Sequence, residues 1–407
     1  MLRWVRLFLL VLVVLPSFYI LVVTYKGLYK ISVHPMEYNY SREEHSVSEI
    51  QQVVFAKIHK AASSTVQNIL LRFALTRNLT VLLPLRGAMI NQKSFQIVRR
   101  RMVPHPDGKE KFDILCNHVV YNEAEIAKYF PDSAVRVVIL REPMKQALSA
   151  LVYYSTRYRT PFLKKALEKY PNDPINGYLR HPEDFYEPDK YWGPMTSFIN
   201  NRMSLDLGFD PYQFELSKHN TTKIETFLKT VEKEFDLVLI SDYFEESMVL
   251  LRRKLRWSMK DIIYLKVNTA KQQRIPPPLK RKPKISSKVA QIFRQWDKID
   301  FKLYEHFLPK FQRAIRAEPH FEQEVRAFKT IRKEVEKFCL HDMIHENLII
   351  SKSVWGDSFI ITKFDCFVMQ SEEIPLVEAA RQIQLFRYRY NSKTIYFPKR
   401  HKMFTGK

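Results

Sequence analysis

Short apolar runs, most of them followed by an amphipathic segment, organise the first part of this 407-residue chain. The runs span residues 52–58, 112–116, 135–140 and 237–240, and each has the length of a buried strand. After the first run, apolar residues recur at the i, i+3, i+4 and i+7 spacing of a helix. Because strands and helices alternate, the pattern predicts an α/β fold with a P-loop-like parallel sheet flanked by helices.

The pattern changes further along the chain. Residues 156–212 are rich in Pro, Tyr, Asp and Asn and show weak periodicity, which predicts a long elaborated insertion. Residues 286–339 read as charged helices, and 348–350 and 359–361 are weaker strand candidates. The last stretch, residues 387–407, is basic and aromatic and indicates no particular role.

The N-terminus carries a nearly continuous apolar segment at residues 7–25, which is long enough to span a membrane. A cleaved signal peptide is the alternative, but no clear small-x-small cleavage site follows. We therefore expect a cytoplasmic tail at 1–6, a signal anchor at 7–25 and a stem at 26–48. A lumenal domain over 49–345 and a C-terminal extension over 346–407 complete the predicted organisation.

Charge, sequons and cysteines refine this picture. A net charge of +23 indicates an anionic partner, and a nucleic acid would explain the charge but not the anchor. Three cysteines allow at most one internal bridge and form no zinc-ligand pattern. If the bulk of the chain is lumenal, three sequons are glycosylation acceptors. They are Asn39, Asn78 and Asn220.

The first strand ends in a loop suited to a small anion. Lys60 and Ala62 precede Ser63, Ser64 and Thr65, which are good residues for a helix N-cap and first turn. Helix N-terminal N–H groups and a lysine ammonium can converge on a phosphate there. The loop has no glycine, whereas a nucleoside triphosphate loop needs them, which disfavours a nucleotide kinase. A helix cap without a ligand is the simpler alternative.

Two further elements carry candidate site residues. Arg141 ends the 135–140 strand and Ser149 follows two helical turns later, so both could hold a second phosphate. The alternative is an ion pair between Arg141 and Glu142 or another carboxylate, with Ser149 an ordinary helix hydroxyl. His118 follows the 112–116 strand, and a neutral imidazole suits a general base.

These motifs together resemble the galactose-3-O-sulfotransferases, a family of Golgi carbohydrate sulfotransferases that includes galactosylceramide sulfotransferase. The resemblance spans about residues 53–296. Several separated motifs carry it in one order: Lys57-Ile58-His59-Lys60-Ala61-Ala62-Ser63-Ser64-Thr65, Cys116-Asn117-His118, Leu140-Arg141-Glu142-Pro143 with Ser149, Asp206-Leu207-Gly208, Ser241-Asp242-Tyr243-Phe244-Glu245-Glu246-Ser247 and Leu265-Lys266-Val267-Asn268.

The resemblance implies a sulfotransferase fold, a donor and a reaction. The donor is 3′-phosphoadenosine-5′-phosphosulfate, with the first loop on its phosphosulfate and Arg141 and Ser149 on its 3′-phosphate. The acceptor is a galactose hydroxyl, expected to be the 3-OH, in a glycolipid or glycan, and no metal is required. Lys60 would face the sulfur, and His118, like the catalytic histidine of related uronyl sulfotransferases, is favoured as base over His59. The family also implies a single-pass type II Golgi membrane protein.

Two positions depart from the family pattern. Ile58 and Ala61 stand where relatives often have Thr, so one hydroxyl contact to the donor is expected to be missing. The alternative function is therefore a catalytically inactive, membrane-anchored glycan-binding protein with the same fold. Lys60 and the Ser63–Thr65 hydroxyls remain, and main-chain N–H groups do not depend on the side chain. We expect donor binding to survive.

Overall fold

The computed structural model describes residues 48–391, with gaps at 92–93, 158–160, 187–197, 267–278, 280–282 and 343. The expected tail, anchor and most of the stem, the Asn39 sequon and residues 392–407 lie outside the described residues, as do Val267 and Asn268 of the last family motif. Among the helices inside the described ranges, none combines the length and apolar character that a membrane span needs.

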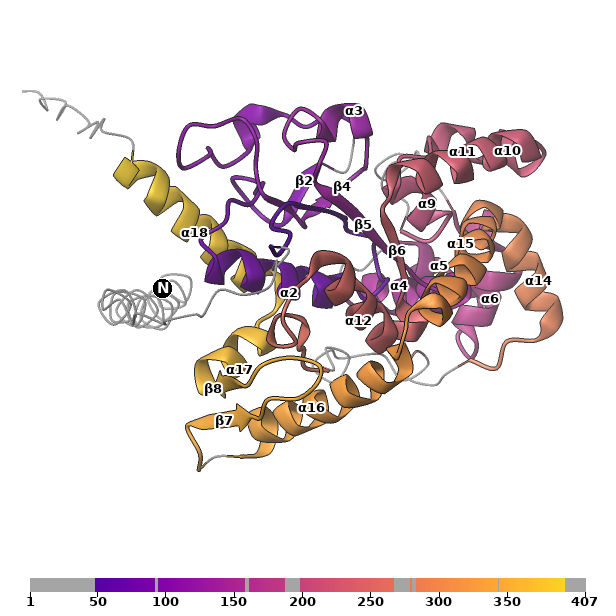
Figure 1. Ribbon diagram of the computed structural model, residues 1–407. Coiled ribbons are helices and arrows are strands. Elements are labelled where there is room, and N and C mark those ends of the chain that lie inside the picture. Colours follow the sequence, from indigo (N-terminus) through magenta and orange to yellow (C-terminus); the bar gives the residue numbers. More distant parts are fainter. Residues whose placement is uncertain are drawn as a thin grey trace, which may run out of the picture. The chain divides into compact units, whose positions relative to one another are not determined.

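A four-stranded parallel sheet forms the centre of the molecule (Figure 1). Its strands lie in the order β3 (Ile114–Leu115), β1 (Val53–Ala56), β5 (Val135–Leu140) and β6 (Leu237–Ile240). Val53 is opposite Val135, and Val137 is opposite Leu237. The carboxyl ends of parallel strands share one edge of a sheet, so the loops after β1, β3 and β5 are brought to the same edge.

The strands of this sheet are buried on both faces. Such strands need a continuous apolar sequence, which is what the predicted runs supply. Every residue of β1 and β5 is buried. The bounds of β5 and β6 match the prediction, whereas β1 and β3 are shorter than the 52–58 and 112–116 runs. The predicted α/β fold with a parallel sheet is confirmed.

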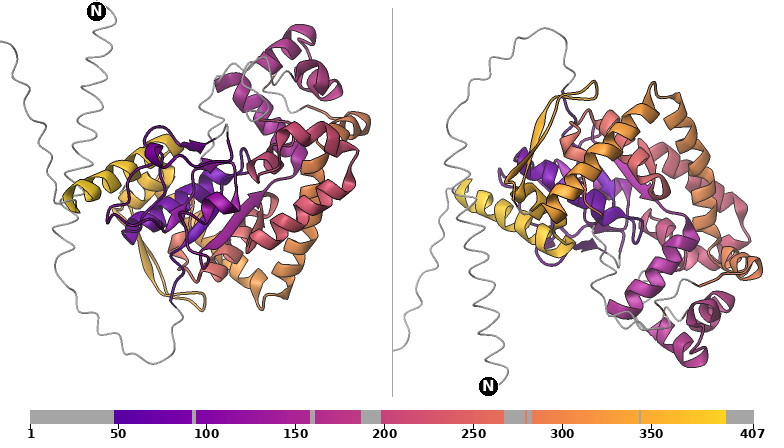
Figure 2. Two further views of the ribbon diagram at one scale, coloured as in Figure 1. Left: turned by 90° about the horizontal axis from the view of Figure 1, so that it is seen from above. Right: turned by 90° about the horizontal axis from the view of Figure 1, so that it is seen from below.

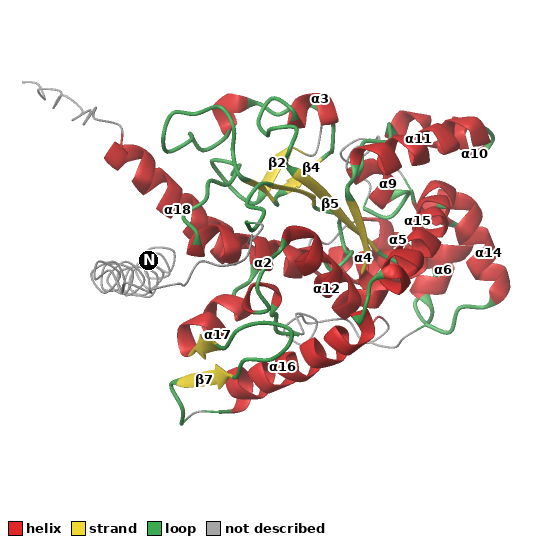
Figure 3. Ribbon diagram, viewed as in Figure 1, coloured by secondary structure: helices red, strands yellow, loops and turns green. Residues whose placement is uncertain are grey.

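Helices cover the sheet and connect its strands (Figure 3). α2 (Ser63–Thr76) follows β1, α4 (Pro143–Arg157) follows β5, and α12 (Phe244–Leu255) follows β6. Each begins within a few residues of its strand, so its N-terminus lies at the carboxyl edge of the sheet. α11 (Thr221–Glu234) leads into β6.

A second, two-stranded parallel sheet lies beside the first. It pairs β2 (Met89–Asn91) with β4 (His118–Val119), and α3 (Glu123–Ile126) follows. His118 therefore begins a strand of its own, three residues after β3 ends at Leu115. The short 3₁₀ turns are η1 (Arg99–Arg101) in this part of the chain, η4 (Ser241–Tyr243) after β6 and η5 (Lys260–Ile262) after α12.

The predicted insertion at 156–212 is more helical than its weak periodicity indicated. Its short helices are α5 (Pro161–Lys169), α6 (Pro174–Arg180), α7 (Pro182–Phe185) and α9 (Arg202–Asp206), followed by η3 (Pro211–Gln213) and α10 (Phe214–Lys218). Pro at the first helical position presets the backbone of α5, α6 and α7. Apolar residues of α4 and α6 form a second core with α14 (Ser287–Trp296). Figure 2 shows α5, α6 and α7 away from α18.

The C-terminal part wraps the sheet with helices, as predicted for residues 286–339. α15 (Lys298–Ala317) and α16 (Phe321–His341) follow α14, and the two weak strand candidates form an antiparallel hairpin, β7 (Asn347–Ile350) with β8 (Phe359–Thr362). α17 (Lys363–Gln370) and α18 (Glu373–Asn391) come next.

The C-terminal helices are joined to the core in two ways. Cys339 of α16 and Cys366 of α17 form a disulfide, while Cys116 is a buried free thiol. α18 lies along α2, far from it in sequence (Figure 1), and buries Leu376 and Val377 in the main core. Part of the predicted extension therefore contacts the helix that follows the first loop.

Candidate active site

The loop between β1 and α2 turns sharply at two non-glycine residues. Lys60 and Ala62 both have φ of 62°, a left-handed conformation that is unfavourable for residues with a Cβ. Ala62 is the N-cap of α2, so the expected serine or threonine side-chain cap is absent. Ser63 instead donates its hydroxyl hydrogen to the carbonyl oxygen of Ile58. α2 begins directly after this turn, so its N-terminus lies at the loop, where an anion site would need it.

The second predicted element contacts this loop directly. The Arg141 guanidinium donates from Nη1 to the carbonyl oxygen of Lys60 at 2.8 Å, and Gln146 of α4 donates to that of His59 at 3.1 Å. The predicted alternative for Arg141 was an ion pair with Glu142, but the Glu142 carboxylate accepts the N–H groups of Met144 and Lys145 instead. The two candidate phosphate elements are therefore in contact.

The remaining candidates lie on the loop itself, in the first turn of α2 and on α4. The Lys60 ammonium sits over the Tyr153 ring of α4, 3.6 Å from its centroid, a cation–π contact. Ser64 and Thr65 stand in the first turn of α2. Ser149 is half-buried in α4.

A buried lysine that the sequence analysis did not select lies under the loop. The Lys57 side chain is 1% exposed, and its ammonium donates to Ser64 Oγ at 3.1 Å. It also lies 3.0 Å from His118 Nε2 and 3.3 Å from Glu373 Oε2 at the start of α18. Lys57 thus joins a hydroxyl, an imidazole and a carboxylate from three different elements.

The contacts of His118 define its tautomer. Nδ1 lies 3.0 Å from the Lys57 carbonyl oxygen, which can only accept, so Nδ1 carries the hydrogen. Nε2 then has the lone pair and accepts from the Lys57 ammonium. The unprotonated nitrogen of this ring therefore faces the anion loop, which is the state a general base needs.

His59 has a different set of partners. Its ring Nδ1 lies 2.9 Å from Asp206 Oδ2, and its backbone N–H donates to the same carboxylate at 2.8 Å. Arg202, buried in the same short helix α9, donates to the other carboxylate oxygen at 2.5 Å. Asp206 thereby holds His59 by ring and backbone together, in the way that orienting carboxylates hold histidines.

Both histidines are neutral at neutral pH. Burial holds the pKa of His118 and of His59 well below the ordinary value, and nearby cations lower both further. Arg202 and Lys57 are the main cations acting on His59, while Lys57 and Arg202 are the cations acting on His118. A neutral imidazole can accept a proton, so both rings fit a base.

The two departures from the family pattern are core residues. Ile58 and Ala61 are fully buried among the apolar side chains of the main core. Their side chains therefore serve packing in this chain, while Lys57, Lys60, Ser63 and Ser64 make polar contacts at the loop.

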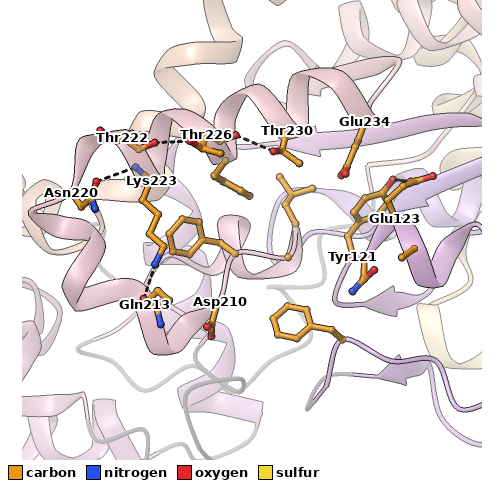
Figure 4. Close-up of a pocket in the computed structure, with 17 residues that line it drawn as sticks. Tyr121, Glu123, Asp210, Gln213, Asn220, Thr222, Lys223, Thr226, Thr230 and Glu234 are labelled. Atoms are coloured by element: carbon orange, nitrogen blue, oxygen red, sulfur yellow. Dashed lines mark hydrogen bonds between the residues drawn. The ribbon is translucent and has the colours of Figure 1, made fainter.

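A cavity of about 850 Å³ opens between α11 and the segment after β4 (Figure 4). Carboxylates of Glu123, Asp210 and Glu234 line it together with Thr222, Thr226 and Thr230 along one face of α11. Its wall includes Gly208, where a Cβ would lie 2.5 Å from the Tyr121 carbonyl oxygen, so only glycine fits. Lys223 and apolar side chains such as Phe209 and Phe227 lie among these carboxylates and hydroxyls, so the lining is mixed in charge and polarity.

Sequence reasoning missed Lys57, Arg202, Asp206 and Glu373 as site residues. Lys57 lies within the apolar run that predicts the first strand. A lysine in such a buried run signals a paired or functional charge, because lysines are rarely buried without a partner. Asp206 appeared within a family motif but without a partner. Within the part of the chain that is described, no group of three or more His, Cys, Asp and Glu side chains is arranged to hold a metal ion.

A parallel sheet whose first loop gathers lysines, hydroxyls and a helix N-terminus, with an arginine from the next unit and a neutral histidine beside it, fits a sulfotransferase. The family comparison gives the same class. The galactose-3-O-sulfotransferase family model matches residues 2–351. The chain belongs to the galactose-3-O-sulfotransferase family and is a carbohydrate sulfotransferase.

Individual relatives support this membership. The chain is 31% identical to human galactose-3-O-sulfotransferase 2 over 296 residues, covering 72% of this chain and 69% of the relative. It is 31% identical to human galactose-3-O-sulfotransferase 3 over 320 residues, covering 78% and 69%. Human galactosylceramide sulfotransferase is 27% identical over 292 residues, covering 71% and 64%.

Proposed function

We propose that this chain transfers the sulfuryl group of 3′-phosphoadenosine-5′-phosphosulfate to the 3-OH of galactose in a glycolipid or glycan. The contact of Arg141 with the loop carbonyl at Lys60 is the observation that carries this proposal, because it joins two anion-binding elements into one site. The names of the relatives supply the acceptor, since they act on galactose or galactosylceramide.

The residues fit the donor as follows. The N–H groups at Ala62–Ser64, the Ser64 and Thr65 hydroxyls and the Lys60 ammonium would bind the 5′-phosphosulfate, and Arg141 with Ser149 the 3′-phosphate. Lys60 rests on the Tyr153 ring, so its long side chain can reach the sulfuryl oxygens by leaving that ring. Its charge would stabilise the negative charge that develops on those oxygens.

His118 is the proposed base. The acceptor hydroxyl oxygen forms a bond to sulfur while the bond from sulfur to the 5′-phosphate oxygen breaks, and the hydroxyl proton passes to His118 Nε2. In the structure this nitrogen accepts from Lys57, so the acceptor hydroxyl must take the place of that hydrogen bond. Lys57 would keep its contacts with Ser64 and Glu373.

We also propose a Golgi location, with a single-pass type II anchor at 7–25 and a lumenal domain. A disulfide between Cys339 and Cys366 suits an oxidising compartment, and both described sequon residues, Asn78 and Asn220, are exposed. Asn78→Gln and Asn220→Gln should each remove one glycan from the protein made in mammalian cells. Unchanged gel mobility after endoglycosidase treatment of the wild-type chain would contradict a lumenal domain.

The experiment for the activity uses the full-length chain, solubilised from membranes, with radiolabelled donor and a panel of galactosides. We expect sulfated galactoside, and permethylation analysis should place the sulfate at the 3-position. Lys60→Ala should weaken binding of the product nucleotide, 3′-phosphoadenosine-5′-phosphate, measured by calorimetry. A chain that transfers nothing and binds no product nucleotide would overturn the proposal in favour of an inactive glycan-binding relative.

A further inference from the structure

The C-terminal segment reaches into the candidate active site. Glu373 is the first residue of α18, and its carboxylate accepts from Lys57 Nζ at 3.3 Å and from Ser64 Oγ at 3.1 Å. Its other oxygen lies 4.0 Å from His118 Nε2. The family match ends at residue 351, so this carboxylate comes from outside the matched residues.

Packing holds Glu373 in this place. α18 lies on α2, and its residues Leu376, Val377 and Ala380 are buried in the main core. On α2, the Asn68 amide donates to the carbonyl oxygens of Val368 and Ser371, just before α18 begins. The carboxylate is thus presented by a docked helix and a hydrogen-bonded turn.

Lys57 requires an anion because a buried ammonium without one is very costly. Glu373 is the carboxylate within ion-pair distance of its Nζ, whereas Asp206 is occupied by His59 and Arg202. Burial lowers the pKa of Lys57, and Glu373 opposes this by Coulombic attraction and a hydrogen bond. Charged and titratable groups from several elements act on Lys57, His118 and His59. They are Glu373, Cys116, Asp206, Lys60 and Arg202, together with the two histidines and Lys57 themselves.

We propose that Glu373 is a positioning residue of the sulfotransferase site, which keeps Lys57 cationic and aimed at Ser64 and His118 so that the donor anion meets a charged lysine. This rests on the proposed function, because the donor is what the charged Lys57 would attract. The role of α18 is then to complete the donor site from the far end of the chain.

The test compares Glu373→Gln with Glu373→Asp and with a matched control, Glu372→Gln, in the full-length chain. Glu372 is the exposed neighbour of Glu373. Glu372→Gln therefore removes one carboxylate charge beside the site without removing the partner of Lys57. The main readout is the pH profile of kcat/KM for the donor, which reports ionisations of the free enzyme. In Glu373→Gln the alkaline limb of this profile should shift to lower pH by about one unit or more, because Lys57 without the carboxylate loses its proton more readily.

The other variants should leave this limb closer to the wild type. Glu373→Asp keeps a carboxylate and should restore most of the profile, and Glu372→Gln should match the wild type. An unmoved limb in Glu373→Gln would overturn the proposal and leave a structural role. Tighter binding of 3′-phosphoadenosine-5′-phosphate by Glu373→Gln at pH 7 would also overturn it. The Glu373 carboxylate would then occupy the anion site and compete with the donor. If Glu373→Gln loses both turnover and the acidic limb of the profile, Glu373 is the base and the positioning role is overturned.

A second measurement needs no donor and separates this proposal from the proposed function. Without its carboxylate, Lys57 is an unpaired buried cation whose folded-state pKa lies further below its unfolded value, so stability should rise with pH as the ammonium loses its proton. The melting temperature of Glu373→Gln should therefore fall furthest below the wild type at pH 7 and approach it towards pH 10. A constant difference across that range would contradict the ion-pair role even if the wild type transfers sulfate. Absence of transfer by the wild type would instead count against the proposed function.

Discussion

The imidazole of His118 stacks on the imidazole of His59, with ring centroids 3.8 Å apart and planes 19° from parallel. The two candidate bases are thus in direct contact, but their partners differ. His118 presents the lone pair of Nε2 to the Lys57 ammonium, while His59 is tied through Nδ1 to Asp206. The two rings can be told apart by their contacts, because His118 contacts Lys57 whereas His59 contacts Asp206 and Arg202.

Replacing the proposed base should lower turnover selectively. We expect His118→Asn to reduce kcat by about 10²–10⁴-fold, the usual contribution of a general base, and to change binding of 3′-phosphoadenosine-5′-phosphate only slightly. Steady-state kinetics and calorimetry measure the two quantities. His59→Asn is the comparison: if it abolishes turnover while His118→Asn retains it, His59 is the base.

Arg141 should contribute through the 3′-phosphate. Arg141→Ala should weaken binding of 3′-phosphoadenosine-5′-phosphate by about 10–100-fold, as expected for loss of a charge-assisted hydrogen bond to phosphate. Binding of adenosine 5′-phosphate, which lacks the 3′-phosphate, should change much less. Lys145→Ala is the control, because Lys145 is an exposed cation on the same helix that pairs with Asp242. Equal losses for both nucleotides would show that Arg141 acts only on the loop.

Stability should fall in mild acid because of the buried histidines. Their folded-state pKa values are lowered, so the unfolded chain binds more protons below about pH 6.5, and stability decreases as pH falls through that window. Melting temperatures between pH 7.5 and 5 should show this, with a smaller slope in a His59→Asn, His118→Asn double variant. The comparison must be with the wild type, because buried Asp300, whose pKa is raised to about 6, contributes a slope of opposite sign. Identical slopes would contradict buried, neutral histidines.

The disulfide should stabilise the C-terminal helices. Cys339 and Cys366 are 27 residues apart, and closing a loop of that size is worth roughly 3–4 kcal/mol in the chain-entropy model. Cys366→Ser should lower the melting temperature measured under non-reducing conditions, and a reductant should lower that of the wild type in the same way. Cys116→Ser, which changes a buried thiol outside the bridge, should leave the effect of the reductant intact.

The sheet could be predicted because its strands are buried on both faces. The continuous apolar run at β5 gave the strand with correct bounds, and the helices after β1, β5 and β6 followed from their spacing. β3, with two residues, was too short to bound from composition. The insertion between α4 and α10 was misjudged because several of its helices are short and begin at proline, so they present few turns of periodicity.

The site was only partly predictable for a related reason. His118, Arg141 and the loop hydroxyls follow strand ends, and parallel strands bring such positions together. Asp206 and Arg202 lie on α9, which is five residues long and has no readable pattern. Glu373 has no local signal at all, since its significance comes from the docking of α18 on α2.

The sequence separation of 316 between Lys57 and Glu373 also bears on the order in which the site can form during synthesis. A ribosome that has finished the anion loop still has most of the chain to make, and until α18 emerges the loop lysine has no carboxylate from this helix. A chain that stops after residue 268 and before residue 373 keeps every family motif found in the sequence yet lacks this partner. The ion pair of Lys57 with Glu373 can therefore form only after nearly the whole chain has been synthesised.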